Sequence, residues 1–244
     1  VVSFSGTREA MYRANLHLRC SSRVLLRLGD ERCGSAEELY EVAAAIPWER
    51  YLDPRGTLAV SAHGTGPGLA NSMYTAVRVK DAVVDRLRSR FGTRPDVDVH
   101  NPSVRINVQL YAGSVGAGGR GQTPRVAIAL DSSEQPLYQR GYRAAQGDAP
   151  LKETLAAAIL RLAQYGAPAE GAAPVPVIDL CCGSGTLLAE AGLLALSRAP
   201  GRRRRFGFMR WPDFDARLFQ SLCAEADAAE RKVSTPFLFG SDID

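Results

Sequence analysis

The sequence lacks the features of membrane-spanning, disulfide-bonded and metal-bound proteins. Its 244 residues contain no run of 18 apolar residues, the length at which a transmembrane helix is expected. The five cysteines are scattered and odd in number, which favours a reducing cytoplasm over a disulfide framework. The histidines, His17, His63 and His100, have no partners at metal-ligand spacing. We therefore expect a cytoplasmic protein with no membrane span and no metal site.

The composition is that of an ordinary globular protein with a modest positive charge. Hydrophobic residues make up 45% of the chain and charged residues 23%, and its length suffices for one or two domains with a sizeable core. The net charge of +4 and a sequence pI near 8.9 favour a polyanionic partner without identifying it.

Arginine is concentrated in places that suit contact with a nucleic acid. Two of these are the segment 139–143 and the four-residue run 202–205. Phe206, Phe208 and Trp211 follow that run, and aromatic rings can stack on unpaired bases while arginines hold phosphates. A solvated loop is the competing interpretation of such a run. The arginines predicted to bind RNA are Arg140, Arg143, Arg202, Arg203, Arg204 and Arg205.

The most informative stretch is Asp-Leu-Cys-Cys-Gly-Ser-Gly-Thr at 179–186. It joins an apolar stretch at 175–178, which predicts a strand covered on both faces, to a predicted helix from Thr186 to Ala199. A glycine turn lets a ligand approach the backbone, and a helix N-terminus attracts an anion. Asp179 adds a partner for a cation. The methionine end of S-adenosylmethionine carries both a carboxylate and an ammonium, and it suits this pair of groups.

Three other kinds of ligand-binding turn share this architecture, and a single residue of the sequence excludes each of them. A dinucleotide fingerprint requires a third glycine where Leu188 stands. A phosphate-binding P-loop requires a lysine that does not follow Gly185. A nucleophile elbow requires glycine where Cys182 stands. A plain strand-to-helix turn without a ligand remains open as an alternative.

A second acidic residue supports the cofactor interpretation. The stretch 237–244 predicts the next strand, with Asp242 near its C-terminal end. In doubly wound sheets, a carboxylate at this place commonly accepts hydrogen bonds from the ribose hydroxyls of a nucleotide. The intervening stretch 200–234 contains the basic loop and a second helical segment.

The first part of the chain predicts a separate α+β module. Val104, Ile106, Val108 and Leu110 alternate with polar residues, which is typical of a half-buried strand. Arg125–Leu130 is its expected hairpin partner across an exposed, glycine-rich loop at 113–123. Other expected strands are 23–28 and 57–62, and expected helices are 8–18, 36–45 with Ser35 as N-cap, 72–90, and 151–165 with Asp148 as a possible cap.

Several segments together resemble a known family, the bacterial large-subunit ribosomal RNA guanine-N2 methyltransferases, which join an RNA-binding THUMP domain to a class I methyltransferase. The likeness covers nearly the whole chain. The segments that carry it are Arg23–Gly29, Asn71–Ser72, Val79–Asp85, Arg105–Val108, Ala129–Ser133, Arg140–Arg143, Ala149–Ala158, Cys182–Leu188, Ala199–Gly201, Trp211 and Gly240–Asp242.

The resemblance implies an α/β chain in which an α+β THUMP-type domain precedes the first half of a doubly wound, Rossmann-like methyltransferase domain. The implied boundaries are 1–38 for the remainder of an N-terminal ferredoxin-like region, 39–131 for the THUMP domain and 132–244 for the methyltransferase part. The implied cofactor is S-adenosyl-L-methionine, and the implied partner is large-subunit ribosomal RNA with an unpaired or extruded base.

The resemblance also implies cofactor contacts by position. Asp179, Cys182, Gly183, Gly185 and Thr186 would hold the methionine moiety, and the acid that matches the ribose-binding position is Asp242. The segment 149–154 resembles the family's cofactor-covering loop and helix start, which adds Lys152 and Thr154. Leu180 stands where the family usually has proline.

The family's Asn-Pro-Pro-Tyr motif, which binds the target amine, does not occur in the sequence. Asn101-Pro102-Ser103 lies in the other domain and predicts a turn. We therefore expect an internal fragment whose catalytic half lies beyond Asp244 and which does not turn over by itself. Two alternatives stay open: an RNA-binding module with an incomplete cofactor fold, and, less well supported by the glycine pattern, a nicotinamide oxidoreductase.

Overall fold

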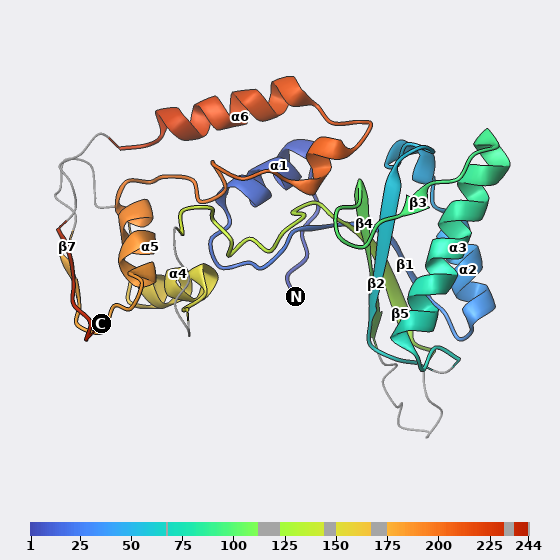
Figure 1. Cartoon of the computed structure of the whole chain (residues 1–244), viewed down its shortest axis with the longest axis horizontal. Coiled ribbons are helices and arrows are strands. Elements are labelled where there is room, and N and C mark those ends of the chain that lie inside the picture. The colour runs from blue at the N-terminus through green and yellow to red at the C-terminus, as the bar shows by residue number, and fades with distance from the viewer. Residues whose placement is uncertain (67, 112–122, 144–149, 167–174, 232–236, 244) are drawn as a thin grey trace. The chain divides into compact units, whose positions relative to one another are not determined.

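The chain forms two compact units in the computed structural model (Figure 1). The structure describes residues 1–66, 68–111, 123–143, 150–166, 175–231 and 237–243. The sheet unit comprises Leu25–Glu134 and Gly207–Phe214, and the glycine-turn unit comprises Val1–Val24, Gln135–Phe206 and Asp215–Asp244. The first 24 residues thus fold with the region that follows residue 134. The boundaries expected at 38 and 131 stay predictions.

The sheet unit is built on five strands in the order β1-β5-β4-β2-β3. The pair β4 and β5 is antiparallel, as the predicted hairpin requires, and β5 also pairs antiparallel with β1. The strand β2 runs parallel to both β4 and β3. The strands are β1 (Leu25–Arg32), β2 (Thr57–His63), β3 (Asp96–Val97), β4 (Val104–Tyr111) and β5 (Arg125–Asp131).

Alternation of apolar residues determines which face of this sheet is buried. The four predicted inward residues of β4 are all at most 3% exposed, and the polar residues between them are partly exposed. The helices α2 (Ala36–Ala45) and α3 (Ser72–Phe91) pack against the sheet (Figure 1). The side chains of Ser35 and Asn71 accept hydrogen bonds from backbone N–H groups in the first turns of these helices. The predicted apolar stripe of α3, namely Val79, Ala82, Val83 and Leu87, is fully buried.

The aromatic residues after the arginine run are core residues, which corrects the expectation that they stack on bases. Trp211 is 5% exposed and meets Tyr51 edge to face, with ring centroids 6.3 Å apart. Phe208, in the 3-10 helix η2 (Gly207–Arg210), is fully buried against Phe214. Phe206 belongs to the other unit and is 1% exposed. Because each ring is already covered, none offers a stacking platform.

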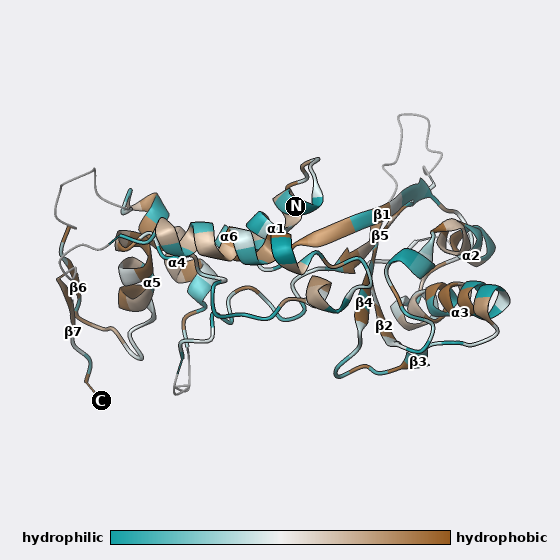
Figure 2. Cartoon of the chain, turned by 90° about the horizontal axis from the view of Figure 1, so that it is seen from above, coloured by the Kyte–Doolittle hydropathy of each residue, from teal (hydrophilic) through white to brown (hydrophobic). Residues whose placement is uncertain are grey.

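The glycine-turn unit combines helices with two parallel strands, β6 (Val177–Asp179) and β7 (Leu238–Gly240). Its helices are α1 (Arg8–His17), α4 (Glu153–Leu162), α5 (Thr186–Ala195) and α6 (Ala216–Ala228). The helix α5 is coloured as hydrophobic over most of its length in Figure 2, and its buried side packs on α4. Tyr12 of α1 meets Phe219 of α6 edge to face at 5.7 Å, which joins the N-terminal segment to this unit.

The strand expected to be covered on both faces is instead largely exposed. Ile178 in β6 is 62% exposed, and Phe239 in β7 is 49% exposed. Among the described residues, β6 and β7 pair with each other alone, so one side of each strand has no neighbouring strand. The helices predicted at 151–165 and 186–199 are also shorter than expected, at ten residues each. The predicted loop at 113–123, apart from Thr123, and the cap Asp148 lie outside the described residues.

Glu49 provides a pH-dependent contact in the sheet unit. It lies in the 3-10 helix η1 (Trp48–Arg50) and accepts two hydrogen bonds of 3.0 Å from the guanidinium of Arg86 on α3, with Arg90 pairing at 2.5 Å. Hydrogen bonding to Arg86 lowers the pKa of the Glu49 carboxyl to about 2. The unfolded chain therefore takes up the proton first as the pH falls.

We predict that Glu49→Gln lowers the free energy of unfolding at pH 7 by about 1 kcal/mol, because partly exposed ion pairs are screened by solvent. The difference in the free energy of unfolding between the variant and the parent should have its full size above pH 4.5 and should shrink as the pH falls toward 2. Urea unfolding at several pH values measures it. Glu41→Gln, at an exposed position of α2, is the matched control. A difference that does not depend on pH would contradict the assignment.

Candidate cofactor site

The glycine turn has the open backbone that the sequence predicts. The turn follows Asp179 at the end of β6 and precedes Thr186 at the start of α5. Gly183 and Gly185 have φ angles of 52° and 74°, in the left-handed region that favours glycine. A Cβ atom built at either residue would have no described atom within 4 Å. A ligand can therefore reach the backbone at both positions, beside a helix end that carries partial positive charge.

The strand β7 brings Asp242 directly to this turn. The backbone N–H of Gly183 donates to the Asp242 carboxylate at 2.6 Å, and Cys182 and Asp179 exchange backbone hydrogen bonds with Ser241 at 3.0 and 2.9 Å. Residues 59 positions apart in the sequence thus share one site. A carboxylate has acceptor positions for further hydrogen bonds, so Asp242 can accept from a ligand as well.

The packing under the turn explains why small residues occur there. A Cβ atom on Gly240 would lie 2.9 Å from the sulfur of Cys182 and 2.6 Å from a methyl group of Leu188. The half-buried Cys182 therefore packs against a bare backbone position of β7. The neighbouring Cys181 is exposed. All five cysteines are free.

The other two residues predicted to contact the cofactor, Lys152 and Thr154, lie at the start of α4. Lys152 caps the helix without a side-chain hydrogen bond to it, and its exposed ammonium lies 5.6 Å from the centre of the Tyr138 ring. Thr154 lies in the first turn and is 9% exposed. The preceding residues 144–149 lie outside the described residues. A role for Lys152 and Thr154 in cofactor binding therefore stays a prediction.

Arg143, which was expected to contact RNA, connects the start of α4 to the glycine turn. Its guanidinium donates to Ser184 Oγ at 2.9 Å, Thr186 Oγ1 at 2.8 Å and the Leu151 carbonyl at 3.1 Å, and it pairs with Glu153 at 3.2 Å. Its side chain is 18% exposed. The expectation of an RNA contact is wrong, because acceptors inside the unit occupy the donor groups of this side chain.

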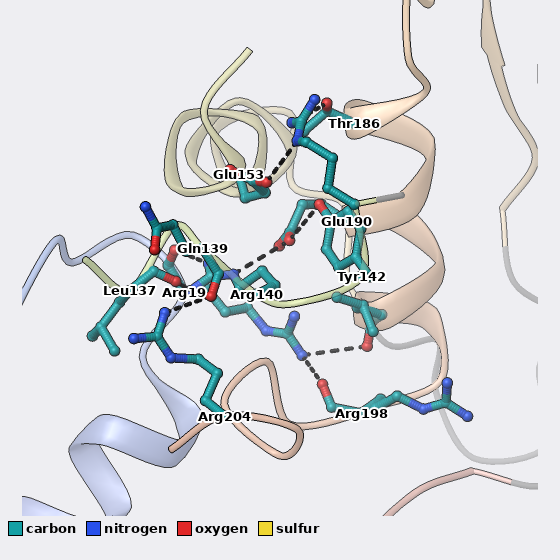
Figure 3. Close-up of polar contacts among 12 residues, drawn as sticks. Arg19, Leu137, Gln139, Arg140, Tyr142, Glu153, Thr186, Glu190, Arg198 and Arg204 are labelled. Atoms are coloured by element: carbon teal, nitrogen blue, oxygen red, sulfur yellow. Dashed lines mark hydrogen bonds and ion pairs between the residues drawn. The ribbon is translucent and has the colours of Figure 1, made fainter. Parts of the chain in front are cut away.

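Arg140 requires the same correction, since it is 3% exposed. It pairs with Glu190 of α5 and donates to the carbonyls of Leu137 and Arg19 (Figure 3). Tyr142 donates to the same Glu190 carboxylate at 3.1 Å. Burial raises the pKa of the Glu190 carboxyl and lowers the pKa of Arg19 to about 10. This cluster is a buried polar network within the protein and not an RNA interface.

One residue of the sequence indicates this network, although the concentration of arginines does not reveal it. Glu190 interrupts an otherwise apolar helix, Thr-Leu-Leu-Ala-Glu-Ala-Gly-Leu-Leu-Ala. An acid in such a place has to find a cation, because a buried unpaired charge is costly. Arg19 was the less obvious partner: it donates to the carbonyls of Leu193 and Arg198 and so fixes the C-terminal end of the helix (Figure 3).

The arginine run at 202–205 divides into bound and exposed side chains. Arg202 pairs with Asp227 of α6 at 2.6 Å, and Arg204 donates to the carbonyls of Gln135, Pro136 and Gln139 at 2.6–2.7 Å. Arg203 and Arg205 are exposed. Arg203, with Arg202 and Arg198, also lines a surface cavity of about 390 Å³ at the C-terminal end of α5. The run is therefore partly a structural loop and partly a basic surface.

No group of three or more His, Cys, Asp or Glu side chains suited to a metal ion occurs among the residues that the structure describes. Over the same residues, none of the helices has the length and hydropathy required to cross a membrane.

Comparison with family models matches three stretches of the chain. Residues 33–116 match the THUMP domain, residues 140–244 match the RMKL-like methyltransferase domain, and residues 1–25 match the RlmL ferredoxin-like domain. The chain thus has a THUMP domain followed by a Rossmann-like methyltransferase fold.

The individual relatives are consistent with this class. The ribosomal RNA large subunit methyltransferase K/L of Aeromonas hydrophila is 40% identical over 247 residues, which cover the whole of this chain and 32% of that protein. Protein slr0064 of Synechocystis sp. is 39% identical over 244 residues, again the whole chain, and 59% of that protein. The chain therefore spans between a third and three fifths of the length of these curated relatives.

Solved structures share this fold. SMU.472, solved in complex with SAH, superposes with a TM-score of 0.80 and 28% identity over 98% of this chain and 59% of that one. A protein from Listeria monocytogenes, titled a predicted N6-adenine-specific DNA methylase, gives a TM-score of 0.81 and 28% identity over 98% of this chain and 58% of that one.

Because Glu190 is fully buried with Arg140, we predict that Glu190→Ala destabilises the glycine-turn unit by about 3–5 kcal/mol, the usual cost of leaving one partner of a buried pair. Glu190→Gln should cost less, because the amide still accepts from Tyr142. Urea unfolding measures both. Glu225→Ala, which breaks the exposed pair with Arg13, is the control and should change little. Equal effects of Glu190→Ala and Glu225→Ala would refute the assignment.

Proposed function

We propose that this chain carries the THUMP domain and the cofactor-binding turn of an S-adenosyl-L-methionine-dependent RNA methyltransferase of the K/L type, acting on large-subunit ribosomal RNA in the cytoplasm. The observation that carries the proposal is the hydrogen bond between the Gly183 N–H and Asp242, which places a carboxylate beside an open glycine turn. The named relatives and the neighbour solved with SAH support the same cofactor.

The residues of the site fit the two ends of this cofactor. Asp179 supplies an acceptor for the ammonium of the methionine end, and the backbone around Gly183 and Gly185 approaches its carboxylate at the helix N-terminus. Asp242 accepts from the ribose hydroxyls. Cys182, Thr186, Lys152 and Thr154 line the remainder of the proposed site. When bound, S-adenosyl-L-methionine supplies an activated methyl group on its sulfonium.

The proposed target is the exocyclic N2 amine of a guanine in 23S ribosomal RNA. Support for this finer assignment is the family resemblance of the sequence, since a fold alone does not define a substrate. The Listeria protein, whose title names a DNA methylase, illustrates that point. The 244 residues contain no Asn-Pro-Pro sequence, so the groups that orient the amine are not among the residues assigned here. Asn101 instead accepts from Arg210 within the sheet unit.

RNA contact is proposed for the exposed members of the arginine run together with the THUMP domain. Arg203 and Arg205 are the arginines of this run that are exposed and have no described acid or carbonyl bound. Arg202 adds charge from the same loop, but its pairing with Asp227 reduces the net charge and the number of N–H donors available to a phosphate.

We predict that the chain binds S-adenosylhomocysteine and that Asp242→Ala weakens binding by about 10–100-fold, because hydrogen bonds to a charged acceptor contribute about 1.5–3 kcal/mol. Isothermal titration calorimetry measures the dissociation constants. Asp227→Ala, which removes an exposed carboxylate on α6, is the control and should leave binding unchanged.

The same titration with NAD separates the reaction classes. Binding of NAD in preference to S-adenosylhomocysteine would support the oxidoreductase alternative. Binding of neither ligand would leave the RNA-binding module as the better description and would contradict the methyltransferase proposal.

We also predict that replacing both Arg203 and Arg205 by alanine weakens RNA binding and reduces the slope of log affinity against log salt by about 1.4, because each lost phosphate contact on a single strand contributes about 0.7. A fluorescent single-stranded RNA titrated at several salt concentrations measures both quantities. Arg13→Ala is the control, because that arginine lies outside the run and is already paired with Glu225 and Glu9. An unchanged salt slope in the double variant would remove Arg203 and Arg205 from the interface.

A further inference from the structure

We propose that Arg143 is a positioning residue for the methionine end of the cofactor: it holds the start of α4 against the glycine turn so that both present their groups to one ligand. The inference rests on the proposed cofactor site and deepens it. Neither Arg143 nor its acid partner Glu153 belongs to the set of residues expected to touch the cofactor.

The contacts of Arg143 fall on two elements that are separate in the sequence. On α4 and the residue before it, the guanidinium binds the Glu153 carboxylate and the Leu151 carbonyl. On the turn, it binds the hydroxyl groups of Ser184 and Thr186 at 2.9 and 2.8 Å. Glu153 and Thr186 lie on the two helices that Figure 3 shows side by side. One planar side chain thus fixes the distance between α4 and the turn.

The turn needs such a restraint because of its composition. Gly183 and Gly185 have no side chains, and no described atom would touch a Cβ at either position. Their conformational freedom is large, and ordering them costs entropy. Ser184 stands between these glycines and Thr186 follows them, so anchoring the two hydroxyl groups fixes the turn from within.

Burial and charge indicate a geometric role for Arg143. Its side chain is 18% exposed and that of Glu153 is 6% exposed, so the two charges form a mostly buried pair. Glu153 neutralises the guanidinium locally, which leaves little net field for attracting the cofactor carboxylate. The contribution of Arg143 to the site is therefore its pattern of hydrogen bonds. A lysine cannot reproduce this pattern, because it lacks the planar, forked donor group.

The two ends of the proposed site differ in whether Arg143 touches them, and this makes the inference testable. Arg143 binds Ser184, Thr186 and the start of α4, beside the proposed methionine end. The proposed ribose acceptor, Asp242, is held by the backbone N–H groups of Gly183 and Ile243, and Arg143 binds neither of them. Loss of Arg143 should therefore impair binding of the amino-acid part and leave binding of the nucleoside part nearly unchanged.

The experiment compares S-adenosylhomocysteine with 5′-methylthioadenosine, which lacks the amino-acid part, by calorimetry on the parent chain, Arg143→Lys and Arg143→Met. We expect both variants to lose about 10–100-fold in affinity for S-adenosylhomocysteine, from the lost charge-assisted hydrogen bonds. Affinity for methylthioadenosine should change by less than about twofold. Arg13→Met, at an ion pair elsewhere in the same unit, should leave both affinities unchanged.

Each contrary outcome has a distinct meaning. Equal weakening of both ligands would show that Arg143 only supports the fold, and full binding by Arg143→Lys would show that charge and not geometry matters; either overturns the inference. Unchanged binding in both variants overturns it as well. If the parent binds neither ligand, the proposed cofactor site itself fails. If Arg143→Met does not fold by circular dichroism, Glu153→Gln replaces it and should show the same selective loss.

Discussion

A carboxylate inside an apolar helix has to be neutralised, and this requirement organises the glycine-turn unit. Glu190 lies in the middle of α5 with its side chain fully buried, and Arg140 supplies the opposite charge. The same arginine binds the carbonyl of Arg19, whose own guanidinium binds carbonyls at the end of α5. Three stretches distant in the sequence are therefore joined around one helix, the helix whose N-terminus forms the proposed cofactor site. If Glu190 were left unpaired, that helix would lose its fixed place.

Several arginines of this unit bind groups within the protein. Arg140 and Arg143 belong to a segment rich in arginine, which suggested a nucleic-acid contact. In the structure Arg140 binds Glu190 and backbone carbonyls, and Arg143 binds Glu153, a carbonyl and two hydroxyl groups. A guanidinium has five donors in a fixed plane, which suits it to connecting several backbone and side-chain acceptors at once. The number of arginines available to a partner is therefore smaller than the composition implies, and within the run 202–205 the exposed arginines with no described acid or carbonyl bound are Arg203 and Arg205.

The two halves of the proposed site depend on different kinds of contact. The turn and β7 are connected by backbone hydrogen bonds and by the close approach of Gly240 to Cys182. The turn and α4 are connected by the side chain of Arg143, and α4 also packs on α5 through apolar side chains such as Leu160 and Leu194. Backbone pairing is insensitive to substitution, whereas a side-chain connection is lost with one residue. This difference is why the nucleoside end and the methionine end of the site are expected to respond differently to mutation.

The sequence by itself determined the local elements: the cap at Ser35, the alternation in β4, the stripe of α3, and the glycine turn with its positive φ angles. Each follows from the period of the apolar residues or from the steric freedom of glycine, which act within a few residues. Only the tertiary structure decided which charges are buried, that Trp211 and Phe208 are core residues, that β6 is exposed, and that Arg143 and Asp242 meet one turn. Those outcomes depend on contacts between residues tens of positions apart, and no local pattern of residues contains them.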